Sequence, residues 1–254
     1  MTAILRAPSL RDRLILPEDP FNARSARHRA PGRRPLEFLL NPHRFGSAAS
    51  AKVFECLFEG ANGSTTFTDT FGKTITRTGA VSISTAQFAD GTSSGLFAGG
   101  TADYLSLFVS TDFDFGSGAF RIRAKIRPAT VTGIHVIATT RSGAGSDPGF
   151  WFVQDGANIR FICWGPTAGV SITDFASTGG LAVNTWADVE VQRAPLGGTF
   201  SLYINSVLAN TNAGSGAAIV ASSNNMRIGS DPSTTSRGFN GYMDTLQIFK
   251  GGLV

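Results

Sequence analysis

Four cations recur at every second position of a short segment near the middle of the chain. Residues 120–127 alternate apolar and basic side chains, and successive side chains of a β-strand point to opposite faces. One face would then carry all four cations, Arg121, Arg123, Lys125 and Arg127. Such a stripe could dock an acidic polysaccharide, lipopolysaccharide phosphates or an acidic protein surface. The alternative is a solvated sheet face whose cations meet acidic residues on the neighbouring strands.

Two tryptophans stand at the ends of expected strands. Trp151 follows a glycine-rich loop, and Trp164 precedes Gly165 and Pro166. An exposed aromatic face at such an edge could stack on a sugar ring, and half-buried packing is the alternative. Trp186 and Tyr203 lie within strand patterns and are interpreted as packing residues.

Alternation with period two, broken by glycine-rich turns, runs from residue 52 to the end of the chain. It predicts an all-β fold of many short strands. The content of 30 glycines and only 16% charged residues agrees with many short strands joined by tight turns. The expected strands cover residues 53–58, 65–68, 73–76, 80–84, 94–98, 103–109, 118–127, 133–140, 149–154, 157–164, 169–175, 185–193, 198–205, 207–210, 225–229 and 240–249.

Several broad classes of protein are disfavoured by the sequence. No apolar run approaches the roughly 18 residues that a membrane-spanning helix needs. No apolar core typical of a secretory signal is found in residues 1–30, so we expect folding in a cytosol. Cys56 and Cys163 fall inside expected strands, where a reduced, buried thiol is favoured over a disulfide.

Residues 1–50 differ from the rest of the chain. They contain nine arginines and no lysine against four acidic residues, a net charge of +5, whereas residues 51–254 carry a net charge of −1. Six prolines and the lack of periodicity predict an extended, mostly irregular arm, followed by one sandwich domain over residues 51–254. Arginine could contact nucleic-acid phosphates, but only three phenylalanines accompany it, so we favour an anchor that binds a protein partner. The expected anchoring residues are Arg11, Arg13, Leu14, Ile15, Leu16, Arg33, Arg34, Leu36, Phe38 and Leu39.

Several short segments together resemble a known family. They are residues 60–69, 102–105, 112–120, 120–128, 186–191, 202–205 and the closing segment 239–249. In this order they resemble the laminin G-like domains of the concanavalin A-like lectin/glucanase superfamily, of the type encoded in tailed bacteriophages. The resemblance runs from about Val53 to Phe249. It implies a two-sheet antiparallel jelly-roll sandwich of the concanavalin A-like kind, in which residues 53–58 pair with residues 242–249.

The resemblance also bears on metal binding and catalysis. Some members bind calcium at the rim of the sandwich, and the acidic positions of the pattern fall on Asp103 and Asp244. For Asp244 a structural hydrogen bond to a loop is the favoured alternative. Glucanases of the superfamily carry a Glu-x-Asp-x-Glu stretch, which this sequence lacks, so we expect no enzymatic activity. No other cofactor is expected.

These observations lead to a hypothesis about function. We expect a virion structural protein of a tailed phage or phage-like particle, a decoration, spike or fibre component assembled in the host cytoplasm. Its arm would bind other virion proteins, and its sandwich would face host-surface glycan. Several copies, as a homo-oligomer or as repeated units on the particle, are expected. The alternatives are a cellular carbohydrate-binding or adhesion module and, least favoured, a glycoside hydrolase.

Overall fold

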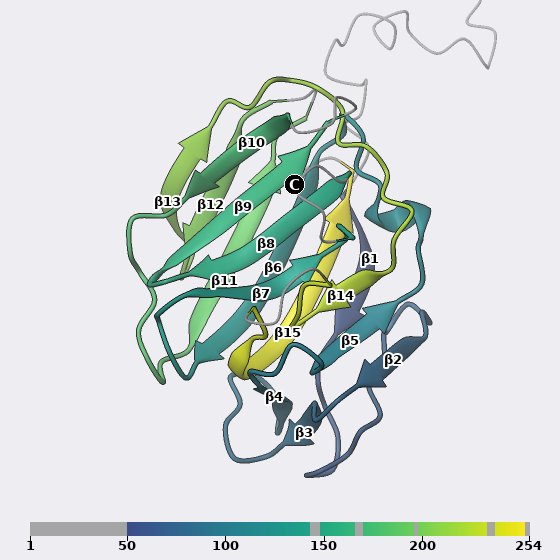
Figure 1. Ribbon diagram of the computed structural model, residues 1–254, viewed down its shortest axis with the longest axis vertical. Helices are drawn as coiled ribbons and strands as arrows, with labels where there is room; N and C mark the ends of the chain where they lie inside the picture. The colour runs from purple at the N-terminus through teal and green to yellow at the C-terminus, as the bar shows by residue number, and fades with distance from the viewer. Residues whose placement is uncertain (1–49, 143–147, 166–169, 196–197, 233–236, 252–254) are drawn as a thin grey trace, which may run out of the picture. The chain divides into compact units, whose positions relative to one another are not determined.

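Antiparallel strands form two sheets that pack face to face in this computed structural model (Figure 1). The structure describes residues 50–142, 148–165, 170–195, 198–232 and 237–251. The predicted arm, apart from Ser50, lies outside the described residues. No helix of the described part is long and apolar enough to cross a membrane. The all-β, two-sheet prediction is confirmed.

The first sheet has eight strands, in the order β13-β12-β11-β6-β15-β4-β3, with β1 also paired to β15. Its members are β1 (Ala51–Cys56), β3 (Ser82–Ser84), β4 (Ser94–Ala98), β6 (Phe120–Pro128), β11 (Ala187–Arg193), β12 (Phe200–Ile204), β13 (Val207–Asn212) and β15 (Asn240–Lys250).

The second sheet has seven strands, in the order β10-β9-β8-β7-β14-β5-β2. Its members are β2 (Ile75–Thr78), β5 (Tyr104–Leu107), β7 (Ile134–Thr139), β8 (Gly149–Asp155), β9 (Asn158–Trp164), β10 (Ser171–Ala176) and β14 (Met226–Ile228). A single turn of 3-10 helix, η3 (Thr111–Phe113), precedes β6.

One predicted strand is wrong. Residues 65–68 form no strand, and only an isolated bridge joins Thr68 to Thr74. The hydroxyl of Ser64 accepts the amide of Thr66, and the carbonyl of Ser64 accepts the amide of Ile83. Local hydroxyl-to-backbone bonds of this kind compete with the pairing of strands.

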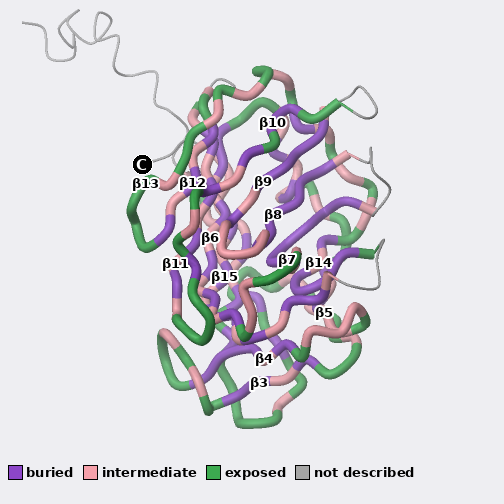
Figure 2. Tube along the Cα trace, turned by 60° about the vertical axis from the view of Figure 1, so that its left-hand side comes forward, coloured by how far each residue is buried: buried purple, intermediate pink, exposed green. Residues whose placement is uncertain are grey.

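Phenylalanine fills the space between the sheets. Phe120 on β6 stacks on Phe115 with ring centroids 4.3 Å apart, and it meets Phe161 of the facing sheet at 5.7 Å. Burial alternates strictly along β6, because its even-numbered side chains point into this core. Figure 2 shows buried segments along the strands of both sheets. β8 is buried on both of its faces, which explains its nearly continuous apolar sequence.

The closing strand β15 holds the eight-stranded sheet together. Residues 240–243 pair with β4, residues 246–250 pair with β1, and β6 runs along the other side. The predicted pairing of the opening and closing strands is therefore confirmed. A shift of register falls between Asp244 and Gln247, where Thr245 has a φ of +47°. Gly241 has a φ of +138°, and a Cβ there would lie 2.3 Å from the carbonyl oxygen of Arg127.

Candidate functional site

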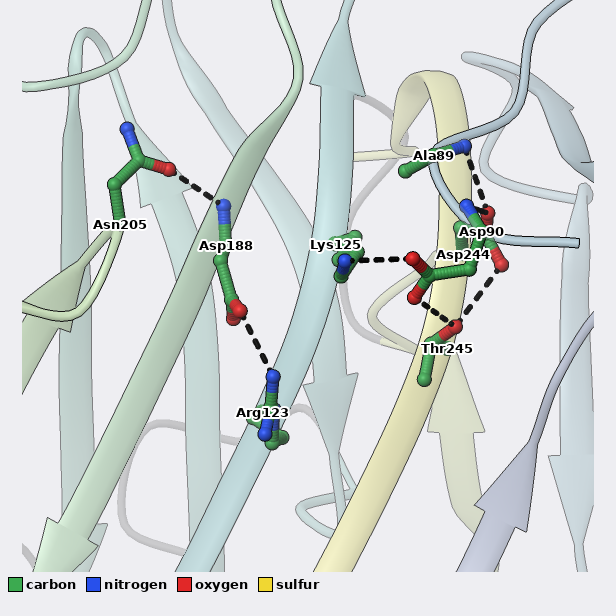
Figure 3. A network of polar contacts seen from close by, with 8 residues as sticks. All are labelled: Ala89, Asp90, Arg123, Lys125, Asp188, Asn205, Asp244 and Thr245. Atoms are coloured by element: carbon green, nitrogen blue, oxygen red, sulfur yellow. Dashed lines mark hydrogen bonds and ion pairs between the residues drawn. The ribbon is translucent and has the colours of Figure 1, made fainter.

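The cationic stripe lies on the outer face of β6, as alternation predicts. Arg123 pairs with Asp188 of β11 at 2.8 Å, and Lys125 pairs with Asp90 at 2.8 Å (Figure 3). Arg127 donates to Asn184 at 3.1 Å. The hydrogen bond from Lys125, helped by its charge, lowers the pKa of Asp90 although burial opposes the shift.

Arg121, the first of the four cations along β6, contacts an aromatic ring. The guanidinium of Arg121 lies 4.2 Å from the ring centroid of Phe249 on β15. The ion pairs of Arg123 and Lys125 mean that two of the four cations are compensated by acidic neighbours. The solvated-face alternative describes these residues better than a docking face for an acidic polymer.

A shallow groove crosses the outer face of the same sheet beside the stripe. One part, of about 280 Å³, is lined by Arg123, Asp188, Glu190, Gln192, Tyr203 and Ser206. A second part, of about 370 Å³, is lined by Phe88, Ala89, Lys125, Trp186, Ala187, Asp188 and Asn205. Asp188 belongs to both linings, so the two hollows form one surface, which we call the outer groove.

Glu190 is the carboxylate of the outer groove that remains open to a ligand. Burial raises its pKa, while the charges of Arg121 and Arg123 act in the opposite direction. Within the described residues, its carboxylate takes part in no hydrogen bond or ion pair. Asp188, by contrast, is held by Arg123. Glu190 can therefore accept hydrogen bonds from a ligand or, when protonated, donate one.

Aromatic side chains border the outer groove. Tyr203 accepts a hydrogen bond from Gln192 at 2.8 Å, so its own hydroxyl proton can serve a ligand. Trp186 is half-buried, and Phe88 is 47% exposed. The groove thus offers ring faces and polar groups side by side.

Sequence reasoning had taken Trp186 and Tyr203 for packing residues, and it had not considered Phe88. The alternation of side chains along a strand indicates that Trp186 and Tyr203 lie on the outer face. Trp186 is an odd number of residues from Val189, which is fully buried, so it belongs to the opposite, outer face with Glu190. Tyr203 stands between two inward-facing residues of β12. Phe88 lies in a loop, where no period applies.

Trp151 and Trp164 do not reach the outer groove. They lie on the outer face of the seven-stranded sheet and are only 4% and 7% exposed. They pack with Val136, Val153 and Ile162 in a small second apolar cluster. The guanidinium of Arg141 lies within 5.2 Å of both ring centroids. The expectation of exposed stacking faces is therefore corrected in favour of packing, because the cluster and the arginine cover both rings.

The two predicted acidic positions bind backbone amides. Asp103 accepts from the amides of Ala80 and Gly100 at 2.6 and 3.2 Å. Asp244 is fully buried and accepts from Ala89 and Asp90, both at 3.0 Å (Figure 3). Burial raises its pKa although both amides oppose the shift. Among the described residues, no group of three His, Cys, Asp or Glu side chains could hold a metal ion.

Comparisons with known proteins agree with this architecture. Residues 99–253, more than half of the chain, match the family model described as Concanavalin A-like lectin/glucanases superfamily. The chain belongs to this superfamily. A comparison with curated proteins gave no match. Since β1 pairs with β15, the sandwich also includes strands that precede the matched residues.

Solved structures share the fold at low sequence identity. The binding domain of Paraclostridial Mosquitocidal Protein 1 is 13% identical with a TM-score of 0.64, over 80% of this chain and 49% of that one. The binding domain of Botulinum Neurotoxin serotype G is 16% identical with a TM-score of 0.59, over 80% of this chain and 49% of that one. This chain therefore spans about half the length of these toxin domains.

A shorter neighbour matches almost over its full length. It is domain 4 of AbnA, a GH43 extracellular arabinanase from Geobacillus stearothermophilus, in complex with arabinotriose. The identity is 13% and the TM-score 0.59, over 81% of this chain and 95% of that one. Similarity at this level establishes the lectin-like fold.

Proposed function

We propose that the chain is a non-enzymatic glycan-binding protein and that the outer groove is its binding surface. The observation that carries the proposal is a groove in which Tyr203 lies beside a carboxylate, Glu190, that has no partner within the described residues. The adjoining part of the groove adds the rings of Trp186 and Phe88. Sugars present apolar ring faces together with hydroxyl groups, so they suit a surface of aromatic rings and open hydrogen-bonding groups. The two toxin binding domains and the arabinotriose complex add support at the level of the fold.

The arrangement of carboxylates in the groove supports the non-enzymatic part of the proposal. Glycoside hydrolysis ordinarily requires two carboxyl groups, one as acid and one as nucleophile or base. Of the two carboxylates in the groove, Asp188 is bound to Arg123 at 2.8 Å, and its amide is fixed by Asn205 (Figure 3). Glu190 alone is open, and a single carboxyl group suits recognition better than cleavage.

The experiment is a binding screen of the full chain against neutral oligosaccharides, including arabinotriose, followed by calorimetry on the strongest ligand. Trp186→Ala should weaken its binding by at least about tenfold, equivalent to about 1.4 kcal/mol. Phe71→Ala is the matched control, because Phe71 is 49% exposed and does not line the groove. Absence of binding throughout the screen would overturn the proposal, as would equal affinity of both variants. Release of new reducing ends would contradict its non-enzymatic part.

We further propose that the sandwich is displayed on a phage-like particle and that residues 1–50 anchor it there. Support comes from the sequence, because residues 1–50 carry a net charge of +5 and six of the 11 prolines. The cellular adhesion module is the competing possibility. Full-length protein should remain bound to purified particles through a salt wash, whereas replacing Arg11, Arg13, Arg33 and Arg34 by Gln should release it. Retention of the substituted protein, or no binding of either form, would contradict the anchor.

A further inference from the structure

A second hollow lies on the other sheet, away from the outer groove. It measures about 350 Å³, within the range of small-molecule sites, which is about 300–1,000 Å³. Its polar lining comes from Arg141, Ser142, Ser223, Asn224, Asn225 and Arg227. Among the described residues that line it, none carries a carboxylate. The hollow therefore presents cationic and neutral polar groups, a set suited to an anion that also has hydroxyl groups.

Arg227 is a cation of this hollow whose setting differs from that of Arg123 and Lys125 on β6. Arg123 and Lys125 each have an acidic partner at 2.8 Å. Within the described part of the chain, Arg227 forms no ion pair, and its guanidinium lies 4.1 Å from the ring centroid of Tyr104. Stacking fixes the plane of a guanidinium while its N–H groups stay available, and that planar fork matches a carboxylate.

An exposed aromatic residue borders the same surface. Arg227 on β14 pairs with Ser106 on β5, and Met226 pairs with Leu107. Phe108 follows directly and is 72% exposed, the largest exposure among the described large hydrophobic residues. The amide of Val109 donates to Asn225 of the hollow at 3.2 Å, which places Phe108 one residue from a direct contact with the lining. A sugar ring could stack on Phe108 while its acidic group reaches Arg227.

We propose that this hollow binds an acidic sugar, a ring bearing a carboxylate, with Arg227 as the carboxylate receptor and Phe108 as the stacking surface. The neutral amides and hydroxyls of Asn224, Asn225 and Ser223 would meet the sugar hydroxyl groups. The site is independent of the outer groove, since it lies on the other sheet and shares no lining residue with it.

The test is calorimetry of the full chain with tri-galacturonate, glucuronate and N-acetylneuraminate, with galactotriose as the neutral comparison. At least one acidic sugar should bind more tightly than galactotriose, and added salt should weaken its binding. Arg227→Gln should lower that affinity at least about tenfold. Arg227→Lys, which keeps the charge but lacks the planar fork, should recover only part of it. Phe108→Ala should also weaken binding.

Two controls make the result specific. Arg77→Gln removes another cation of the seven-stranded sheet, on β2, and should leave the affinity unchanged. Trp186→Ala tests the outer groove and should also leave it unchanged. The proposal is overturned if none of the three acidic sugars binds, or if Arg227→Gln binds as tightly as the unmodified chain. Equal binding of acetate and of the sugar acids would reduce the site to a simple anion site and would overturn the sugar assignment.

Discussion

Glu190 illustrates how a binding residue can reduce the stability of the fold. Its pKa is raised by burial, and in the described residues nothing donates a hydrogen bond to it. A carboxyl group whose pKa is higher in the folded state stabilises the fold at pH values below its ordinary range. That contribution is lost as the pH rises through the raised value. At pH values above the raised pKa, the ionised form is therefore a cost that a bound ligand could offset.

We predict opposite effects for two Glu-to-Gln substitutions on this sheet. Glu190→Gln should raise the melting temperature at about pH 7 and change it little at about pH 4, because Glu190 itself is then mostly neutral.

Glu55 differs. Burial would raise its pKa, but hydrogen bonds from Lys52, Gln247 and Thr70 prevail and lower it. Glu55→Gln should lower stability by about 1 to 2 kcal/mol at about pH 7, through loss of charged hydrogen bonds.

The dependence on pH separates these two cases. Since the pKa of Glu55 is lowered, its contribution is present above the ordinary range of a carboxyl group and is lost only as the pH falls through the lowered value. The defect of Glu55→Gln should therefore begin to shrink only as the pH falls below the ordinary range of a carboxyl group. Thermal melts of the three proteins at both pH values give the measurement. A loss of stability in Glu190→Gln at neutral pH would contradict the assignment of Glu190 as an unsatisfied binding group.

Some single residues can be predicted from the sequence and others cannot. Alternation correctly assigned the four cations of β6 to the outer face. The same period places Arg193 inward, and it is indeed fully buried, donating to the carbonyls of Gly116 and Ala217 at 2.9 and 2.8 Å. The acidic partner of Lys125 is Asp90, which lies in a loop 35 residues earlier in the chain. No local sequence pattern predicts a contact between residues so far apart.

At the scale of elements, a bulge in β15 positions one border of the outer groove. Asp244 at this bulge accepts the amides of Ala89 and Asp90, and the Thr245 hydroxyl donates to Asp90 at 3.2 Å. These bonds fasten the loop that carries Phe88 into the groove. Asp244 therefore has the favoured structural role, which is to form hydrogen bonds to a loop.

The loop gives a second prediction. In Asp244→Asn the side-chain oxygen cannot carry a negative charge, so its two hydrogen bonds to the loop should weaken, by about 1 to 2 kcal/mol in total. The amides of Ala89 and Asp90 should exchange with solvent about ten times faster or more, while the amides of β6 keep their protection. Hydrogen exchange followed by NMR measures both groups. Unchanged exchange at Ala89 and Asp90 would show that other contacts hold the loop.

Strands such as β6, β11 and β12 were predictable because each buries one face and leaves the other exposed, which produces period two along the strand. The exception at residues 65–68 has the β-branched composition of a strand, but local hydroxyl bonds compete for its backbone. The outer groove was not predictable in full, because Phe88 reaches it through bonds to a residue about 155 positions later in the chain.

At the scale of the whole molecule, the two cysteines lie in opposite sheets. Cys56 belongs to β1 and Cys163 to β9, and both are free and completely buried. Burial raises the pKa of each thiol to about 12. Only the thiolate reacts with disulfide reagents, so the native thiols combine low accessibility with a very small reactive fraction.

We therefore predict that both thiols react with a disulfide reagent at about pH 8 only through global unfolding. The labelling rates of the two thiols should be equal and should rise with urea in the same way. When labelling outpaces refolding, both rates should match the unfolding rate measured by tryptophan fluorescence. The variants Cys56→Ala and Cys163→Ala, each retaining one thiol, allow the two rates to be measured separately. Faster labelling of Cys56, with a weaker dependence on urea, would show that β1 opens away from β15 while the rest of the sandwich stays folded. In that case the two sheets would not unfold as one cooperative unit, because the pairing of the opening and closing strands would break first.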